Sequence, residues 1–409
     1  MIYVIGLGFV GLTTAIGLAF KGNDVIGIDK NLEIIKKLNN NKIPFYEPNL
    51  ENILVKVKKK KLILQNKISL ENKDNYFFIC VGTPSKISGA IDLRLIIDAV
   101  NFIINLIKIK KITSKNFIII KSTVIPGTIE LLEKKFKMFS NIFFASNPEF
   151  LREGFAWNDF IYPDKIVIGA KDYFVKKKIS KIFGNFKTKK ILLESKSSEF
   201  LKYFSNIALA NMISYSNEML MLAEKNKINE IKKIFSAFHM DKRWIGKPAN
   251  MSKYYYPGIG FGGYCLPKDL RALVAYSNKN KNKNNILNSI LITNKKIFEY
   301  QIKKIVKNVK KKSKIYLLGM SFKPLSDDLR DSVSIQIAKK LLNLGYKNLI
   351  FCDPMCKNKL KRFFKSKKIL SHPKIEKNSI YILLTAWPEY LKFIKKNKDL
   401  KIIDLRYTN

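Results

Sequence analysis

A cysteine in a glycine-rich segment is the residue with the clearest capacity for covalent chemistry. Gly258–Asp269 contains four glycines, which permit a close backbone loop around a ligand. Pro267 suits the first position of a helix, which would place Cys265 at a helix N-terminus, where the dipole favours the thiolate. Asp269 follows one turn later. The spacing therefore predicts a nucleophilic thiol with a carboxylate close to it.

Other polar residues follow apolar strands or share a helix face. Lys121–Thr128 follows one strand, and Asn147–Gly154, which includes Glu149, follows the next. Ligands gather at such positions in open α/β sheets. Lys202 and Asn206 are four residues apart in an expected helix, so both could hold one substrate oxygen. That spacing alone fits a solvated helix face equally well, and such faces are the commoner case.

The first 29 residues have the pattern of a dinucleotide-binding unit. A strand, Tyr3–Ile5, runs into Gly6–Gly11, which has the spacing Gly-x-Gly-x-x-Gly, and the apolar helix Leu12–Phe20 follows. The first glycine allows a tight turn, the second lets the backbone approach a pyrophosphate, and the third lets helix and strand pack closely. A second strand, Val25–Ile28, ends at Asp29, where a carboxylate would bind ribose hydroxyls. We expect NAD rather than NADP.

The elements that must position these residues alternate along the chain. Short apolar strands alternate with amphipathic segments in the first 190 residues and again after residue 310, which predicts two parallel α/β sheets. Long helical spacing dominates Ser198–Phe238 and the helix around Asn288–Val309. We expect an α/β protein with two Rossmann-like domains, 1–190 and 310–409, joined by a helical middle domain, 191–309. The expected strands are Tyr3–Ile5, Val25–Ile28, Phe77–Val81, Phe117–Lys121, Ile142–Ala145, Ile315–Leu318, Leu349–Cys352, Ile380–Leu384 and Ile402–Leu405.

Composition narrows the class of protein. The formal net charge is +44, but lysines spread along the whole chain beside many Asn and Ile residues indicate a compositional bias, so we expect no nucleic-acid partner. No apolar run reaches the roughly 18 to 20 residues of a membrane span, and we expect a cytoplasmic protein without a membrane partner. The four scattered cysteines fit free thiols. The sequence has only two histidines, so Cys352 and Cys356 lack the further ligands of a convincing metal site. No metal is therefore expected.

Taken in order, these motifs resemble the UDP-glucose/GDP-mannose dehydrogenase family over essentially the whole chain. The resemblance implies an N-terminal NAD domain, a helical domain that forms a homodimer, and a C-terminal domain for the nucleotide of a nucleotide sugar. The matching segments are Gly6–Gly11, Gly82–Pro84, Lys121–Thr123, Asn147–Glu153, Pro163–Lys165, Lys202–Asn206, Asn217–Glu218, Gly260–Asp269 and Gly319–Lys323, with Arg330.

The resemblance also implies a four-electron oxidation. Cys265 would attack the aldehyde formed by the first hydride transfer, and the resulting thiohemiacetal would lose a second hydride to give a thioester. Lys202 and Asn206 match residues that stabilise the oxyanion. Glu149 matches the general base for hydrolysis, and Asp269 matches a position associated with a bound water.

Further residues match family positions that contact the two ligands. The expected cofactor contacts are Gly6, Gly8, Phe9, Val10, Gly11, Asp29, Lys30, Thr83, Pro84, Thr123, Glu153, Lys268 and Arg330, and Thr123 also has an expected role in proton transfer. The expected substrate contacts are Glu149, Phe150, Leu151, Lys202, Asn206, Arg243, Tyr254, Tyr256, Gly258, Gly260, Lys323 and Arg406. Arg243 would reach the site of a neighbouring subunit.

The identity of the sugar is less constrained. Branches of the family that act on N-acetylated sugars tend to carry Gly-Gly-His-Cys without the Pro-Lys-Asp ending, so Tyr264–Asp269 favours UDP-glucose or GDP-mannose. UDP-glucose is preferred as the commoner substrate, with the uronic acid supplying surface polysaccharide. Two other hypotheses are a two-electron hydroxyacid dehydrogenase, which has no use for Cys265, and a nucleotide-binding protein without catalysis.

Overall fold

The computed structural model describes residues 1–241, 257–279, 285–365 and 367–407, which form two compact units. The first comprises Met1–Ser205 with Arg271–Tyr276, and the second comprises Asn206–Leu270 with Ser277–Asn409. Two helices, α8 (Ser195–Lys225) and α10 (Cys265–Lys279), contribute residues to both units. None of the helices within the described ranges has the length and apolar character needed to cross a bilayer.

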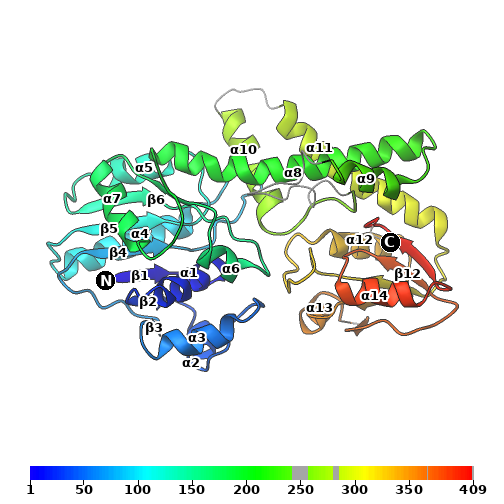
Figure 1. Cartoon of the computed structure of the whole chain (residues 1–409), viewed down its shortest axis with the longest axis horizontal. Coiled ribbons are helices and arrows are strands. Elements are labelled where there is room, and N and C mark those ends of the chain that lie inside the picture. The colour runs from blue at the N-terminus through cyan, green and yellow to red at the C-terminus, as the bar shows by residue number, and fades with distance from the viewer. Residues whose placement is uncertain (242–256, 280–284, 366, 408–409) are drawn as a thin grey trace. The chain divides into compact units, whose positions relative to one another are not determined.

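The first unit is built on an eight-stranded sheet in the order β3-β2-β1-β4-β5-β6-β7-β8 (Figure 1). Neighbouring strands are parallel except β6 and β7, which pair antiparallel at Ser146 and Gly169. Fully buried runs such as Asn116–Ile120 explain why both faces of the sheet are covered by helices. The strands are β1 (Ile2–Ile5), β2 (Val25–Ile28), β3 (Leu62–Gln65), β4 (Asn75–Ile79), β5 (Asn116–Ile120), β6 (Ile142–Ser146), β7 (Ile166–Gly169) and β8 (Lys190–Leu193).

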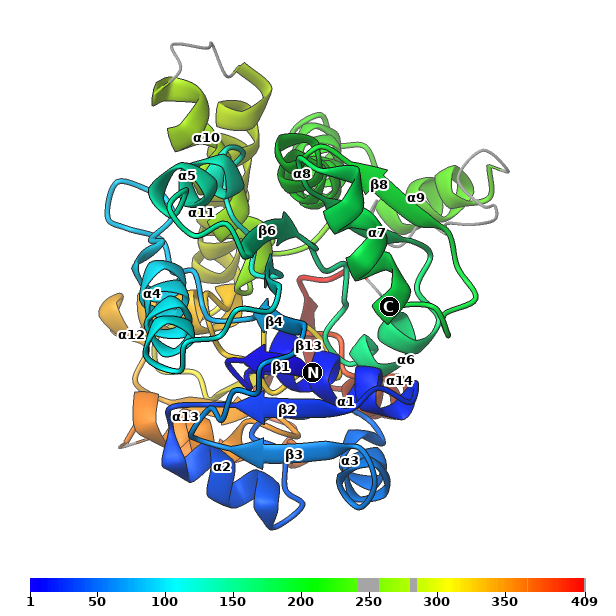
Figure 2. The same ribbon diagram turned by 90° about the vertical axis from the view of Figure 1, so that its left-hand side faces the viewer.

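Helices cover this sheet on two sides, which Figure 2 shows. One hydrophobic core joins α1, α2, α3, α6 and α7 to residues such as Val4 and Phe78, and the other joins α4 and α5 to residues such as Tyr3 and Phe77. Successive strand residues therefore face opposite cores, as the pleat requires. The helices are α1 (Phe9–Phe20), α2 (Leu32–Asn39), α3 (Leu50–Lys58), α4 (Arg94–Ile109), α5 (Thr128–Lys135), α6 (Ala156–Ile161) and α7 (Tyr173–Ile182).

The second unit contains a five-stranded, entirely parallel sheet in the order β11-β10-β9-β12-β13. One core joins this sheet to α11, α12 and α13, and another joins it to α14. The strands are β9 (Ile315–Leu318), β10 (Leu349–Cys352), β11 (Lys368–Leu370), β12 (Ile380–Leu383) and β13 (Lys401–Asp404). The remaining helices are α9 (Ile231–His239), α11 (Asn285–Asn308), α12 (Val333–Asn343), α13 (Lys357–Phe363) and α14 (Pro388–Lys396).

The architecture confirms the expected fold class of two mainly parallel α/β sheets with helical segments between them in the sequence. Every expected strand is present within two residues of its expected bounds. The structure adds β3, β7, β8 and β11, which have three or four residues each and which the sequence analysis did not distinguish from the segments around them. The division at residues 190 and 309 stays a prediction.

The first turns of α8 are fixed to the first sheet by buried polar contacts. Glu199 accepts hydrogen bonds from the backbone N–H groups of Gly127 (2.6 Å) and Ile129 (2.9 Å), at the N-terminus of α5. Ser198 Oγ donates to Ser146 Oγ at 3.1 Å. Burial raises the pKa of the Glu199 carboxyl to about 7, although the backbone N–H groups that donate to it act in the opposite direction.

We predict a pH-dependent contribution of Glu199 to stability. Because its pKa is higher in the folded chain than the ordinary value of 4.5, its contribution is complete below about pH 4.5 and is lost as the pH rises through 7. Between pH 5 and pH 8 the free energy of unfolding should therefore fall by about 2.5 kcal/mol more in the wild type than in Glu199→Gln. Urea titrations at both pH values measure this. Glu33→Gln, which changes an exposed acid on α2, is the control, and parallel pH profiles for wild type and Glu199→Gln would contradict the prediction.

Candidate active site

The loop between β1 and α1 has the geometry of a phosphate-binding turn. Gly6 has a φ of +89°, and a Cβ built on Gly11 would lie 1.7 Å from the carbonyl oxygen of Gly6, so neither position accommodates a side chain. A Cβ built on Gly8, in contrast, would meet no atom within 4 Å, which leaves room for a ligand beside the backbone. The residues present therefore fit the pyrophosphate of a dinucleotide at the N-terminus of α1.

Asp29 completes this loop from the end of β2. Its Oδ2 accepts a hydrogen bond from the backbone N–H of Leu7 at 2.8 Å, and its Oδ1 accepts one from Asn31 at 2.9 Å. The carboxylate thus holds the glycine loop against β2 while retaining lone pairs that can accept from ribose hydroxyls. Lys30, the next residue, is exposed.

The other expected cofactor residues of the first unit lie beyond the carboxyl ends of neighbouring strands. Thr83 and Pro84 follow β4, Thr123 follows β5, and Glu153 lies in the turn between β6 and α6. Since β1, β4, β5 and β6 are adjacent and parallel, these segments share one edge of the sheet. Of the expected residues in the glycine loop, Phe9 packs edge-on against Phe45, with ring centroids 5.4 Å apart, and Val10 packs against the core.

A buried ion pair joins α8 to the loop after β6. Lys202 Nζ lies 3.0 Å from Glu149 Oε1, and both side chains are less than a tenth exposed. The second oxygen of Glu149 accepts a hydrogen bond from the backbone N–H of Leu151 at 2.6 Å. Burial acts to raise the pKa of Glu149, but the charge of Lys202 and the hydrogen bonds outweigh it and lower the pKa. Glu149 is therefore held as a carboxylate.

Two more lysines surround this ion pair. Lys121 Nζ donates a hydrogen bond to Asn147 Oδ1 at 3.0 Å, and burial lowers the pKa of Lys121. The ring of Phe150 lies beneath Lys165 and Lys202, whose Nζ atoms are 4.5 Å and 5.4 Å from its centroid. The Glu149 carboxylate therefore lies close to several cations, a field that favours negative charge on a bound ligand.

A second buried polar cluster lies in the second unit. Asn206 Nδ2 donates to Asp269 Oδ2 at 2.7 Å, and Lys268 Nζ lies 2.5 Å from Asp269 Oδ1. All three side chains are buried. Both expected residues, Asn206 and Asp269, are therefore in direct contact, and Asn206 is one helical turn from Lys202 on α8. The solvated-face interpretation of Lys202 and Asn206 is wrong, because both are buried.

Cys265 is exposed and is the first residue of α10, as its expected role requires. The expectation for Pro267 needs correction, since it is the third residue of α10 rather than the first. Proline is tolerated there because the early N–H groups of a helix have no partner within the helix. The preceding glycines are also constrained: Gly260 has a φ of +99° and Gly263 a φ of +82°. Cys80, Cys352 and Cys356 are buried.

Side-chain amides hold the glycine loop before Cys265. Asn217 Oδ1 accepts from the backbone N–H of Gly258 at 2.8 Å, and Gln301 Nε2 donates to the carbonyl of Gly258 at 3.0 Å. Asn294 binds both the N–H and the carbonyl of Phe261, at 2.8 Å and 3.0 Å. The sequence analysis did not select Asn294 and Gln301. Both are polar residues of the amphipathic helix α11, and no other feature of the sequence sets them apart.

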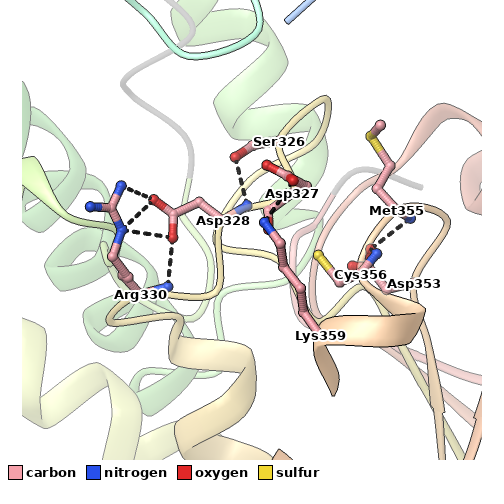
Figure 3. Close-up of polar contacts among 8 residues, drawn as sticks. All are labelled: Ser326, Asp327, Asp328, Arg330, Asp353, Met355, Cys356 and Lys359. Carbon is pink, nitrogen blue, oxygen red and sulfur yellow. Dashed lines mark hydrogen bonds and ion pairs between the residues drawn. The ribbon is translucent and has the colours of Figure 1, made fainter. Parts of the chain in front are cut away.

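Three cationic residues of the second unit were expected to meet ligands. Arg330 forms a bidentate pair with Asp328 (Figure 3). Its guanidinium lies 4.2 Å from the centroid of the Tyr264 ring. Lys323 lies over the ring of Phe322. Arg406 lies beside Gly258, where a built Cβ would be 3.1 Å from its Nη1 atom.

The turn after β9 resembles the glycine loop of the first unit, but its acid is used differently. Gly319 has a φ of +87°, and Asp353 follows β10 as Asp29 follows β2. Asp353 is fully buried, and its two oxygens accept four backbone N–H bonds, from Met320, Ser321, Met355 and Cys356, at 2.9 to 3.0 Å. Figure 3 shows Asp353 beside Met355 and Cys356. This carboxylate therefore stabilises the turn itself.

Some expected residues are not placed. Arg243, Tyr254 and Tyr256 lie outside the described residues. Across the ranges that the structure describes, no group of three or more His, Cys, Asp and Glu side chains could hold a metal ion.

Comparison with known proteins shows the same three-part pattern. Residues 1–187 match the NAD binding domain of the UDP-glucose/GDP-mannose dehydrogenase family, residues 196–296 match its central domain, and residues 316–408 match its UDP binding domain. The chain is 34% identical to a UDP-glucose 6-dehydrogenase of Rickettsia prowazekii (strain Madrid E). The match covers 98% of this chain and 94% of the relative.

Two other relatives define the breadth of the match. A GDP-mannose 6-dehydrogenase of Pseudomonas aeruginosa is 31% identical, over 86% of this chain and 80% of the relative. The solved structure of a UDP-glucose dehydrogenase from Pyrobaculum islandicum is 30% identical, with a TM-score of 0.86, and covers 100% of this chain and 94% of that one. These matches establish that the chain belongs to the UDP-glucose/GDP-mannose dehydrogenase family.

Proposed function

We propose that this NAD-dependent nucleotide-sugar dehydrogenase oxidises UDP-glucose to UDP-glucuronate, a precursor for surface polysaccharide. The observation that carries the proposal is Cys265, an exposed thiol at the first residue of α10, with Asp269 in the next turn. A simple alcohol dehydrogenase has no use for such a thiol, whereas a four-electron oxidation needs a nucleophile at the aldehyde stage. Two relatives that match nearly the whole chain are named as UDP-glucose dehydrogenases.

The first half of the reaction converts the primary alcohol at C6 of the sugar into an aldehyde. NAD supplies a hydride acceptor at this stage and again in the second half. Asp269 and Thr123 would hold the water that receives the hydroxyl proton. Lys202 and Asn206 would stabilise the negative charge that develops on the C6 oxygen, because a buried cation and an amide donor act strongly where water is excluded.

The second half converts the aldehyde into a carboxylate. The sulfur of Cys265 would add to C6, giving a thiohemiacetal, and loss of the second hydride would leave a thioester. Water would then form a bond to C6 as the C–S bond breaks, returning the thiol. Glu149 would take the proton of this water, because it is held as a carboxylate; its lowered pKa makes it a weaker base than an ordinary glutamate.

We propose the remaining roles in the same way. The cofactor would contact Gly6, Gly8, Phe9, Val10, Gly11, Asp29, Lys30, Thr83, Pro84, Thr123, Glu153, Lys268 and Arg330. The nucleotide sugar would contact Phe150, Leu151, Gly258, Gly260, Lys323 and Arg406, besides the residues that act on C6.

GDP-mannose is the second candidate substrate, because a GDP-mannose 6-dehydrogenase matches 86% of the chain. A panel of nucleotide sugars separates the two. With NAD, the purified protein should form two NADH per UDP-glucose, and a higher kcat/KM for GDP-mannose would show that UDP-glucose is not the preferred substrate.

NADP should be a poor replacement for NAD, since the Asp29 carboxylate repels its 2′-phosphate. Equal efficiency with NADP would remove the role given to Asp29.

Replacement of Cys265 should interrupt the reaction after the first hydride. Cys265→Ala cannot form an adduct, so residual oxidation should stop at the aldehyde with one NADH per sugar. Cys265→Ser should lose turnover by several orders of magnitude and accumulate a covalent ester visible by intact-protein mass spectrometry, because oxygen esters hydrolyse far more slowly than thioesters.

A matched control is Cys356→Ala, which removes a buried thiol from the core of the second unit and should keep two NADH per sugar. Calorimetry should show that the Cys265 variants still bind UDP-glucose. If Cys265→Ala formed the uronic acid at a near-normal rate, the covalent mechanism would be wrong.

We also propose a homodimer formed through α8. Phe200, Phe204, Tyr215 and Leu222 recur every four to eleven residues along this helix and are 47%, 64%, 49% and 53% exposed. Large apolar side chains at such spacings form a stripe on one helix face, which a second copy would bury.

The dimer should be visible by light scattering at micromolar concentration. Phe204→Lys places a charge in the middle of the stripe and should weaken association roughly tenfold or more. Phe363→Lys, which changes a phenylalanine on α13 that is 51% exposed, should leave the dimer intact. A monomeric wild type would exclude the proposed assembly.

A further inference from the structure

A polar cluster outside the proposed chemistry surrounds Tyr407, which lies shortly after β13. Its hydroxyl donates to Glu224 Oε1 at 3.0 Å and accepts from Lys304 Nζ at 2.8 Å. Lys304 also lies 2.9 Å from Glu224 Oε1, and Tyr300 donates to the other oxygen of Glu224. The cluster therefore connects α8, α11 and the segment after β13 within the second unit.

The charges in this cluster are fixed. Burial acts to raise the pKa of Glu224, but hydrogen bonds from Tyr300 and Lys304 and the charge of Lys304 outweigh it and lower the pKa. Burial and the neighbouring carboxylate raise the pKa of Tyr407. At neutral pH the cluster thus contains a carboxylate, an ammonium group and protonated hydroxyls, so its hydrogen bonds keep one direction.

The cluster also holds an unfavourable backbone conformation. Tyr407 has a φ of +53°, in the left-handed region that residues with a side chain rarely adopt. On the other side of Arg406, Leu405 is fully buried, and the Arg406 N–H donates to Asp404 Oδ1 at 2.8 Å. Arg406 is therefore fixed from both sides, and such strain persists only where surrounding contacts demand it.

The Arg406 side chain reaches the glycine loop before Cys265. A Cβ built on Gly258 would lie 3.1 Å from its Nη1 and 3.3 Å from its Cζ, and the peptide groups of Gly258 are held by Asn217 and Gln301. In the described part of the chain the guanidinium makes no hydrogen bond or ion pair. Burial lowers the pKa of Arg406, although Asp404 acts to raise it, and a guanidinium keeps its charge.

We infer that Glu224, Lys304 and Tyr407 are positioning residues that hold Arg406 over Gly258 so that its guanidinium binds phosphate oxygens of the nucleotide sugar. The inference rests on the proposed function. A partly buried guanidinium that makes no hydrogen bond or ion pair with the described residues is stabilised by an anion, and its planar shape suits phosphate in particular. The cluster acts through Arg406 and does not touch the reacting atoms.

Two substitutions test the inference with little change in shape. Tyr407→Phe removes one hydroxyl and keeps the ring beneath Lys304, and Glu224→Gln removes the charge that orders the cluster. Tyr390→Phe is the matched control, because it removes a hydroxyl that donates to Ser371 O at 2.8 Å in the same unit. Calorimetry measures the Kd for UDP, and steady-state kinetics gives KM for UDP-glucose and for NAD.

Tyr407→Phe and Glu224→Gln should raise the Kd for UDP and the KM for UDP-glucose about fivefold or more, while the KM for NAD stays within about twofold. Tyr390→Phe should lower the melting temperature without changing the Kd. When Arg406 is already replaced by Lys, Tyr407→Phe should add little to the loss of UDP affinity, because both changes weaken the same contact between the Arg406 side chain and phosphate.

Unchanged UDP affinity in Tyr407→Phe, with only a lower melting temperature, would overturn the inference by showing that the cluster serves stability alone. If Glu224→Gln fails to fold, the Kd of Tyr407→Phe for UDP alone tests the inference. The proposed function fails separately, by absence of UDP-glucose turnover in the wild type, because UDP binding is measured without catalysis.

Discussion

The ion pair between Lys202 and Glu149 is the interaction on which the buried polar cluster of the first unit depends. It fixes α8 to the carboxyl end of β6, where Ser198 and Glu199 add contacts to Ser146 and to the start of α5. Because α8 is one continuous helix of 31 residues, the side chains that follow are presented at set intervals. In the second unit, three later residues of this helix, Asn206, Asn217 and Glu224, contact Asp269, Gly258 and Tyr407.

This arrangement keeps several charges away from water. Glu149, Lys202, Lys121, Lys268 and Asp269 are all buried, and burying an ion costs free energy that pairing repays only in part. Apolar residues of similar volume would give a more stable chain in many such cases. The charges are therefore better explained by the reaction, since preorganised groups need not rearrange when charge develops on the substrate.

The parts that could be predicted from the sequence are those in which neighbours in the chain act together. The turn at Gly6–Gly11, the strand that ends at Asp29 and the helix start at Cys265 each lie within a short segment, so residue type and spacing carry the information. Fold class followed from the alternation of strands and helices. The clusters around Gly258 and Tyr407 could not be predicted in this way, because Gln301 and Glu224 meet their partners 43 and 183 residues away. An amphipathic pattern shows that such residues interrupt an apolar face, but it does not show what they touch.

Asp29 and Asp353 occupy equivalent places in two sheets whose first five strands have the same order, and their difference bears on how the two halves could have diverged. If both sheets descend from one duplicated ancestor, the first sheet has kept an acid, Asp29, that can still bind a ligand. In the second sheet, the carboxylate of Asp353 accepts hydrogen bonds from four backbone N–H groups. That commitment is hard to reverse in small steps, since any change that frees the carboxylate first loosens the turn. New ligands of the second sheet must therefore be bound by other loops. In the first sheet, a substitution of Asp29 can still change which dinucleotide is bound.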